Sequence, residues 1–314
     1  MKLRTIFTFV VLSGFTLSSY ATDTIIVNDT WADGNRTSAG PDGGGIDSVW
    51  YASTAAQTTV PAAGDLRFAI PAGSLFNTTY FPSGTSPYGN AGVTLVNPGD
   101  SLSVTWVFTM TGLNAGNANQ NLALAVVNTP GTHLTTQASP SQQVYAGYST
   151  FMAIEPTFAA TGNAVPFALK EWISGAATSL LGASAAWGAN GAAGNLATDG
   201  ANNGNAGYVN GTVYTYQMNL TLNAFGGLDI LSTMTGAGLN GVNGLTNSVT
   251  DTSPNSLTFD TFAVRAGTSS ATASQFDTSL FRVDFISTSV PEPATFAFAG
   301  LGMLSLVLAR RIRR

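Results

Sequence analysis

The chain contains no cysteine and a single histidine among its 314 residues. Without cysteine it forms no disulfide, offers no thiol nucleophile and supplies no thiolate ligand for zinc. His133 lies in the turn-like stretch NTPGTHLT, and no G-x-S-x-G motif accompanies it as the nucleophile of a hydrolase would. We therefore expect His133 to be an exposed loop residue rather than a catalytic base.

Basic residues are also scarce, and most of those present lie at the two ends of the chain. Between residues 22 and 288, called the body below, five Lys and Arg stand against fifteen Asp and Glu, which gives a net charge of −10. Nucleic-acid binding needs clustered cations that neutralise phosphates, so this composition excludes it. The acidity fits a soluble surface protein and leaves weak cation binding open. The five basic residues are Arg36, Arg67, Lys170, Arg265 and Arg282.

Glutamate is rare in the body, where only Glu155 and Glu171 occur. A glycosidase needs two facing carboxyl groups, and these two residues lack the tight E-x-D-x-x-E spacing of sandwich-fold glycosidases. Glu171 follows Lys170 directly, and we expect the two side chains to pair. The sequence predicts that the protein is not an enzyme and has no cofactor. A hydrolase that uses Glu155 and Glu171 is the third of three hypotheses.

The N-terminus, MKLRTIFTFVVLSGFTLSSYATD, has the order of a secretory signal peptide. Lys2 and Arg4 give a positive start, the apolar segment 5–17 follows, and small residues precede a cleavage site. We expect signal peptidase to cut between Ala21 and Thr22. The segment is too short and too early for a membrane span, and this order does not fit a buried first helix.

The C-terminus combines a short motif, an apolar run and a basic end. The run 294–309 has 16 uncharged residues, which as a helix would extend about 24 Å at ~1.5 Å per residue. This is somewhat less than the ~30 Å of a bilayer core, and snorkelling arginines can cover the difference. By the positive-inside rule the arginines stay in the cytoplasm, so the body is delivered outside. The motif is Val290, Pro291, Glu292 and Pro293, and the arginines are Arg310, Arg311, Arg313 and Arg314.

These three elements in this order at the extreme C-terminus resemble the PEP-CTERM sorting signal. The resemblance implies recognition by exosortase, a membrane-embedded cysteine protease that removes the helix and passes the new C-terminus to an envelope component. It also implies a Gram-negative bacterium that makes extracellular polysaccharide. On this interpretation the helix is a temporary anchor at the inner membrane, and the mature protein, in the envelope or matrix, has no span.

The body is rich in strand-forming residues and poor in helical periodicity. In the segment 101–110, SLSVTWVFTM, every second residue is apolar and the residues between are polar except Val107, and the segment 212–222 follows the same period from Tyr214 on. Period two predicts strands with one buried and one solvated face. A turn at 224–227 joins the second strand to 228–231 as a hairpin, and the segment 280–286 closes the domain. Further strands are expected at 24–27, 48–52, 66–70, 93–96, 122–127, 145–154, 167–173 and 257–264.

These strands predict an all-β fold with two antiparallel sheets packed face to face. A jelly roll of the concanavalin or lectin type is the preferred form, and a parallel β-helix, for which no fixed repeat is present, is the alternative. The segments 182–211 and 236–254 are rich in Gly, Ala and Asn and are expected to be mobile surface loops. The domain organisation is then a signal peptide at 1–21, the body at 22–288 and the sorting tail at 289–314.

Two residue groups in the body are candidate binding residues. Asp29, Asp33, Asp42 and Asp47 lie among Gly and Asn, where calcium is possible but capping aspartates in a polar loop are favoured, because the EF-hand pattern fails. Trp31, Trp50, Trp172 and Trp187 could stack on sugars, although tryptophan is more often packed in a core, as Trp106 is expected to be.

Several body segments resemble envelope proteins that carry the same tail, and this resemblance implies no activity. The sequence therefore leaves open a non-catalytic envelope or matrix protein, a carbohydrate-binding module for extracellular polysaccharide, or the hydrolase. The expected partners are signal peptidase, exosortase, the membrane before cleavage, and polysaccharide. The segments are NDTWADGNRT, SVWYAS, VYAGYSTF, NLTLNAFGGLDI and TFDTFAVR.

Overall fold

A computed structural model of the chain describes residues 20–37, 47–70, 73–82, 92–113, 121–129, 131, 133–139, 145–154, 167–173, 180–182, 184–187, 195–199, 208–239, 244–268 and 274–289. The body forms one compact unit from Asp23 to Ser287. Nearly all of the signal peptide and the sorting tail, including the apolar run 294–309 and the arginines, lie outside the described residues.

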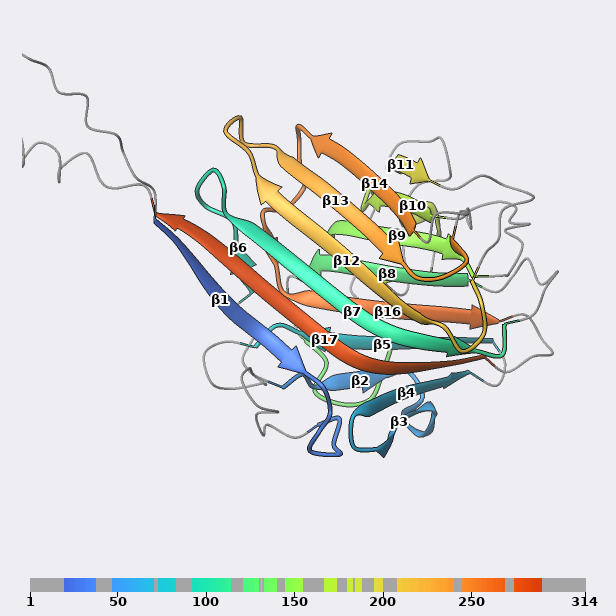
Figure 1. Ribbon diagram of the computed structural model, residues 1–314. Helices are drawn as coiled ribbons and strands as arrows, with labels where there is room; N and C mark the ends of the chain where they lie inside the picture. Colours follow the sequence, from blue (N-terminus) through green and yellow to red (C-terminus); the bar gives the residue numbers. More distant parts are fainter. Residues whose placement is uncertain are drawn as a thin grey trace, which may run out of the picture. The chain divides into compact units, whose positions relative to one another are not determined.

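Two large antiparallel sheets make up the body, as the sequence predicted, and lie one behind the other in Figure 1. The front sheet has the order β14-β13-β12-β7-β17-β4-β3, with β1 also paired to β17, and the back sheet has the order β11-β10-β9-β8-β16-β5-β2. A small pair, β15 and β6, stands apart.

The front-sheet strands are β1 (Tyr20–Asp29), β3 (Thr58–Ala62), β4 (Asp65–Ile70), β7 (Ser101–Thr111), β12 (Val213–Leu222), β13 (Leu228–Thr235), β14 (Gly244–Asp251) and β17 (Ser274–Ser289). The back-sheet strands are β2 (Trp50–Ala52), β5 (Gly73–Tyr80), β8 (Asn121–Asn128), β9 (Ala146–Ala153), β10 (Phe167–Glu171), β11 (Asn195–Asp199) and β16 (Thr261–Thr268). The small pair is β6 (Val93–Thr94) and β15 (Thr258–Phe259), and two short 3-10 helices are η1 (Ala55–Gln57) and η2 (Ser184–Trp187).

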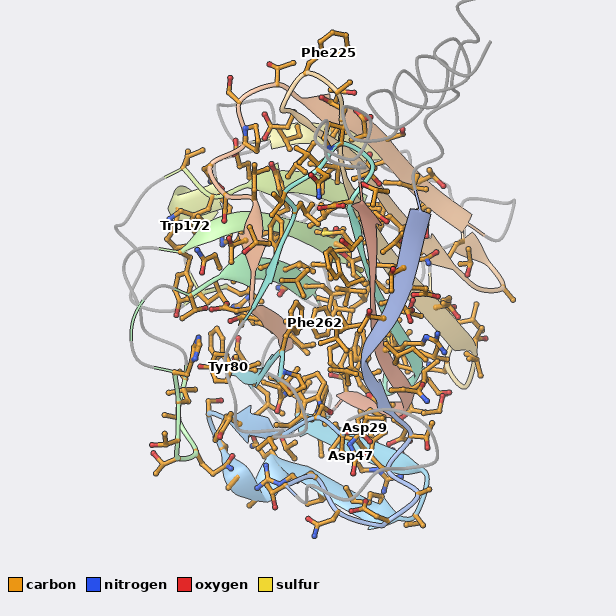
Figure 2. The ribbon with its side chains drawn as sticks, turned by 90° about the vertical axis from the view of Figure 1, so that its left-hand side faces the viewer. Asp29, Asp47, Tyr80, Trp172, Phe225 and Phe262 are labelled. Carbon is orange, nitrogen blue, oxygen red and sulfur yellow. The ribbon has the colours of Figure 1, made fainter. Side chains whose placement is uncertain are left out.

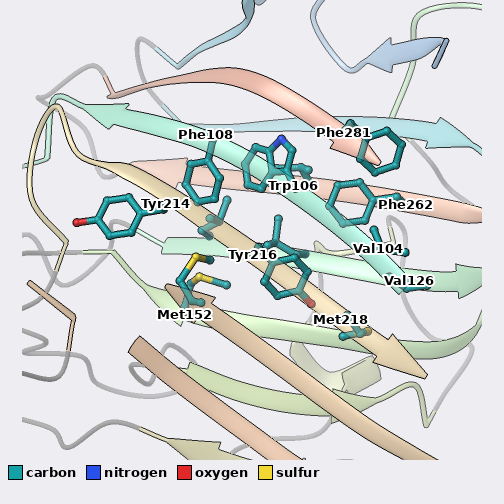
Figure 3. Packing of buried hydrophobic residues seen from close by; sticks show 14 of the residues in the cluster. Val104, Trp106, Phe108, Val126, Met152, Tyr214, Tyr216, Met218, Phe262 and Phe281 are labelled. Atoms are coloured by element: carbon teal, nitrogen blue, oxygen red, sulfur yellow. The ribbon is translucent and has the colours of Figure 1, made fainter. Parts of the chain in front are cut away.

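The core lies between the sheets and is filled by the apolar residues that the period-two pattern pointed inward. On β7 buried and half-buried residues alternate along the whole strand, and Trp106 is fully buried. Its ring stacks on Phe108 with centroids 3.9 Å apart and approaches Phe262 of the back sheet at 6.3 Å. Phe262 in turn stacks on Phe281 of the front sheet at 5.0 Å. Figure 3 shows these rings meeting between the two layers.

The outer face of the back sheet is covered by other parts of the chain. Its outward residues on β8, Ala123, Ala125 and Val127, form a second apolar cluster with Trp172 and Trp187. A third cluster joins Val49, Tyr51 and Tyr80 to Leu134 in the segment 133–139. Trp172 and Tyr80 both lie on this covered side in Figure 2. Among the described residues, the outward side chains of the front sheet on β12 and β13 are half-buried or exposed, so the outer face of this sheet is the open one.

The two segments predicted to be mobile loops instead contribute to the fold, and the prediction was wrong for their described parts. The segment 236–254 contains the edge strand β14, whose Leu245 is fully buried, together with the buried Leu239. The segment 182–211 contains η2 and β11, and its Trp187 and Tyr208 are fully buried. A few large side chains anchor each segment, although its average composition is poor in apolar residues.

Candidate functional site

A hollow of about 730 Å³ lies on the open outer face of the front sheet. Outward residues of five adjacent strands, β14, β13, β12, β7 and β17, form its floor, and Asp23 of β1 closes one side. Most of its lining residues are polar. The polar residues are Asp23, Ser101, Ser103, Asn219, Thr221, Asp229, Ser248, Thr250, Arg282 and Asp284, and the apolar residues are Ile230, Leu231, Val249 and Ile286.

The strand register arranges the floor as two parallel rows across the sheet. The first row runs Thr250, Asp229, Thr221, Ser101, Ile286, and the second runs Ser248, Leu231, Asn219, Ser103, Asp284. Since neighbouring strands lie about 4.8 Å apart, five strands give each row a length of about 19 Å. The hollow is thus an elongated groove, called the front groove below, that suits an extended ligand.

Arg282, the basic residue that lines the front groove, is held by the neighbouring Asp284. The Arg282 Nε lies 2.9 and 2.8 Å from the two carboxylate oxygens of Asp284, and this hydrogen bonding raises the pKa of Arg282. Asp229 accepts a hydrogen bond of 2.7 Å from the Thr250 hydroxyl. Three carboxylates against one paired guanidinium leave the groove negative, which opposes binding of an anionic ligand.

Four neutral side chains of the front groove remain available to a ligand. Asn219, Thr221, Ser101 and Ser248 make no side-chain hydrogen bond within the described part of the chain. Hydroxyl and amide groups both donate and accept hydrogen bonds, so together they match a ligand that is itself rich in hydroxyl groups.

The tryptophans proposed as sugar platforms do not lie in the front groove. Trp31, Trp50 and Trp187 are fully buried and Trp172 is 6% exposed, so the core interpretation is confirmed and the platform interpretation is wrong. The Trp50 ring packs on Phe68 and Phe281 between the sheets. Sequence reasoning missed the groove itself, although its signal was present in the outward Ser, Thr and Asn residues of the alternating strands.

The aspartate cluster near the N-terminus has a local structural role. Asp29 accepts hydrogen bonds from the backbone of Trp31 at 2.8 Å and of Ser48 at 2.9 Å, and from the Ser48 hydroxyl. Burial raises the pKa of Asp29 to about 6, an effect that these bonds oppose and the nearby Asp47 adds to. Figure 2 labels both aspartates.

No group of three or more acidic, histidine or cysteine side chains that could hold a metal ion occurs among the residues placed by the structure. Asp42 lies outside those residues, so calcium binding here stays a hypothesis. The bonds to Asp29 match the favoured alternative, an aspartate that closes a loop.

His133 is not the exposed residue that the sequence predicted. Its Nε2 lies 3.0 Å from the Asp260 carboxylate, and the two side chains are 10% and 9% exposed. The ring packs on Tyr80 with centroids 4.2 Å apart, and Asp260 also accepts bonds from the Thr129 backbone and the Thr261 hydroxyl. The histidine therefore fastens the segment 133–139 to the back sheet, a contact between residues 127 positions apart that local pattern does not reveal.

Glu171 contacts a carboxyl group rather than the neighbouring lysine. It accepts a hydrogen bond of 3.0 Å from the Asn255 backbone, and it lies within hydrogen-bonding reach of Asp251 at the end of β14. Asp251 also accepts a bond of 2.6 Å from the Tyr148 hydroxyl. The Lys170 ammonium instead lies 5.2 Å from the centre of the Phe151 ring. Glu155, the other half of the hydrolase hypothesis, lies outside the described residues.

Glu171→Gln should weaken the pH dependence of stability. Burial raises the pKa of Glu171 from 4.5 to about 7, and the charge of Asp251 adds to this. The folded state favours the protonated form of Glu171. Its contribution to the stability of the fold is therefore fully present below pH 4.5 and is lost as the pH rises through about 7. Because the side chain is partly exposed, the effect is reduced by solvent. Between pH 5 and pH 8, we expect the free energy of unfolding of the variant to improve by about 1 kcal/mol relative to that of wild type. Urea unfolding at both pH values measures this difference. A variant whose free energy of unfolding changes with pH as steeply as that of wild type would contradict the prediction.

Residues 289–314 match the model of the PEP-CTERM protein-sorting motif, which confirms the sorting signal predicted from the sequence. Such a motif marks an exported protein that an exosortase handles. Among the described residues no helix is both long and apolar enough to cross a membrane, and the predicted span 294–309 lies outside them.

No curated protein matches the chain. Among solved structures, the metal-free Emp46p carbohydrate recognition domain is similar at 8% identity and a TM-score of 0.41, covering 74% of this chain and 87% of that one. Peanut lectin with a 9mer peptide is similar at 9% identity and a TM-score of 0.43, covering 86% of this chain and 99% of that one. The VIP36 exoplasmic/lumenal domain in its Ca²⁺/Man-bound form is similar at 15% identity and a TM-score of 0.42, covering 75% of this chain and 82% of that one. With TM-scores below 0.5, these similarities carry no conclusion about a ligand.

Proposed function

We propose that this protein is a non-catalytic cell-envelope protein that exosortase sorts through its tail and that binds neutral extracellular polysaccharide in the front groove. The sorting half rests on the PEP-CTERM motif at residues 289–314. The binding half rests on one observation, the open groove with unused hydroxyl and amide groups along two rows of the front sheet. A body of the jelly-roll type would place this groove on the open face of its sandwich.

The chemistry of the front groove favours a neutral glycan over an acidic one. Arg282 is held by Asp284 and so offers no free cation to a uronate or sulfate group. Asp23 and Asp229 add negative charge to the same surface. Hydroxyl-rich sugars need only donors and acceptors, which Asn219 and Thr221 supply.

The geometry favours binding over hydrolysis. A retaining glycosidase holds its two carboxyl groups about 5 Å apart, and an inverting one holds them farther apart. Glu171 lies beside Asp251, whose charge adds to the rise in the pKa of Glu171. Neither residue lines the front groove.

Thr221→Val should weaken binding of a neutral polysaccharide about five- to tenfold, the cost of one lost hydrogen bond to the ligand. Thr215→Val is the matched control, because Thr215 lies on the same strand and the same outer face but outside the front groove. Isothermal titration with neutral glucans, mannans and galactans, and with alginate as the acidic comparison, measures both variants. Equal losses in the two variants, or preference for alginate, would contradict the proposal.

A further inference from the structure

Two turns at one end of the front sheet hold large apolar side chains out in the solvent. Phe225, between β12 and β13, is 98% exposed, and Val96, between β6 and β7, is 68% exposed. These are the two most exposed large hydrophobic residues in the part of the chain that the structure describes. Figure 2 shows Phe225 at the tip of its turn, pointing away from the body.

The two turns are braced against each other and are therefore fixed in position. The Gly99 backbone N–H donates to the Leu222 carbonyl at 2.7 Å, and the Leu222 N–H donates to the Asp100 carbonyl at 2.9 Å. Asn223 accepts bonds of 3.0 Å from the backbone of Phe225 and of Gly227. These bonds hold Phe225 and Val96 in contact with water on two neighbouring turns at the same end of the sheet.

The chain leaves the body at the same end. Ile286, near the end of β17, is 38% exposed and pairs with Ser101 at the start of β7, which in turn pairs with Thr221. Figure 1 shows the β6–β7 and β12–β13 turns at the end of the sheet toward which β17 runs. From Ser287 to the apolar run at Ala294 the chain has seven residues, which span at most about 25 Å.

We propose that Phe225 and Val96 insert into the surface of the lipid bilayer while the apolar run is embedded, and withdraw when exosortase removes it. This inference rests on the proposed sorting through the tail. A short tether gives the end of the body an effective concentration at the membrane in the millimolar range. A contact of two apolar side chains, too weak to hold the free body, then persists.

Charge does not provide this attraction. The body carries a net charge of −10, so an anionic bilayer repels it, and only the apolar tips of the two turns gain from the contact. Added salt screens this repulsion, so the contact should strengthen rather than weaken as the salt concentration rises.

Single-cysteine labelling tests this directly, because the chain has no cysteine of its own. Phe225→Cys and Val96→Cys each carry one nitroxide in the uncut full chain, reconstituted in nanodiscs of phosphatidylethanolamine and phosphatidylglycerol. Val209→Cys is the matched control, an apolar turn residue, 46% exposed, at the opposite end of β12. We expect the labels at 225 and 96 to collide with an aqueous relaxation agent about fivefold less often than the label at 209.

Equal accessibility at 225 and 209 would overturn the inference. A further label at Ala299→Cys, within the apolar run, separates the two proposals. If that label is exposed to water, the anchoring fails, whereas a buried label at 299 with an exposed label at 225 refutes only the lipid contact. Protection at 225 that persists in the lipid-free cleaved chain would show a second copy on this surface, which also overturns the proposal.

Discussion

Replacing Pro291, Glu292 and Pro293 with alanine should leave the protein exported but uncut. The triplet is the element that distinguishes this tail from an ordinary anchor, and the motif match covers it. We expect export to depend on the signal peptide predicted at residues 1–21, which the change does not touch. Without the protease, we expect the apolar run predicted to span the membrane to stay in the bilayer, because its burial in lipid is favourable. The expected product is therefore full length at its C-terminus and remains in the inner membrane.

Mass spectrometry and membrane fractionation measure this outcome against wild type. Replacing the four arginines with glutamine is the matched control, because it alters the tail and leaves the triplet intact. Without the charges that oppose translocation, the tail should slip outward and the protein should be misplaced or released. Wild-type mature protein that still contains residues 294–314 would show that the tail is a permanent anchor and that the sorting proposal is wrong.

Trp106→Ala should lower the free energy of unfolding of the body by about 4 kcal/mol, the cost of removing a large buried ring. Trp106 is fully buried, stacks on Phe108, and donates its Nε1–H to the Thr278 hydroxyl at 3.2 Å. The substitution deletes ring contacts to both sheets and leaves that hydroxyl without its donor. A loss of this size is a large part of the stability of a domain.

Val107→Ala is the control, because Val107 is the next residue on the same strand and its side chain is half-buried on the opposite face. It should cost less than about 1 kcal/mol. Urea unfolding followed by circular dichroism compares the two variants. Similar losses at 106 and 107 would mean that the sandwich does not bury one face of β7 and expose the other.

The inward face of β7 and β12 could be predicted because strand geometry is local. Successive side chains point to opposite sides of a sheet, so alternation in the segment 101–110 already separates Trp106 from Val107. The same rule predicted the two antiparallel sheets. The strand β14 was missed because an edge strand needs few apolar residues, and Leu245 alone is a weak signal.

The sequence by itself determined the all-β architecture, the buried strand faces and the sorting motif, because each depends on residues close together along the chain. Only the tertiary structure decided which sheet face is open, since Trp172 and Trp187 cover the back sheet through contacts among distant segments. It also decided the partners of His133 and Glu171, whose carboxyl neighbours lie 127 and 80 residues away in the chain. The front groove also depends on the tertiary structure, because it joins residues of five strands. The order and register of these strands bring its two rows together, and the alternation of apolar and polar residues does not encode either of them.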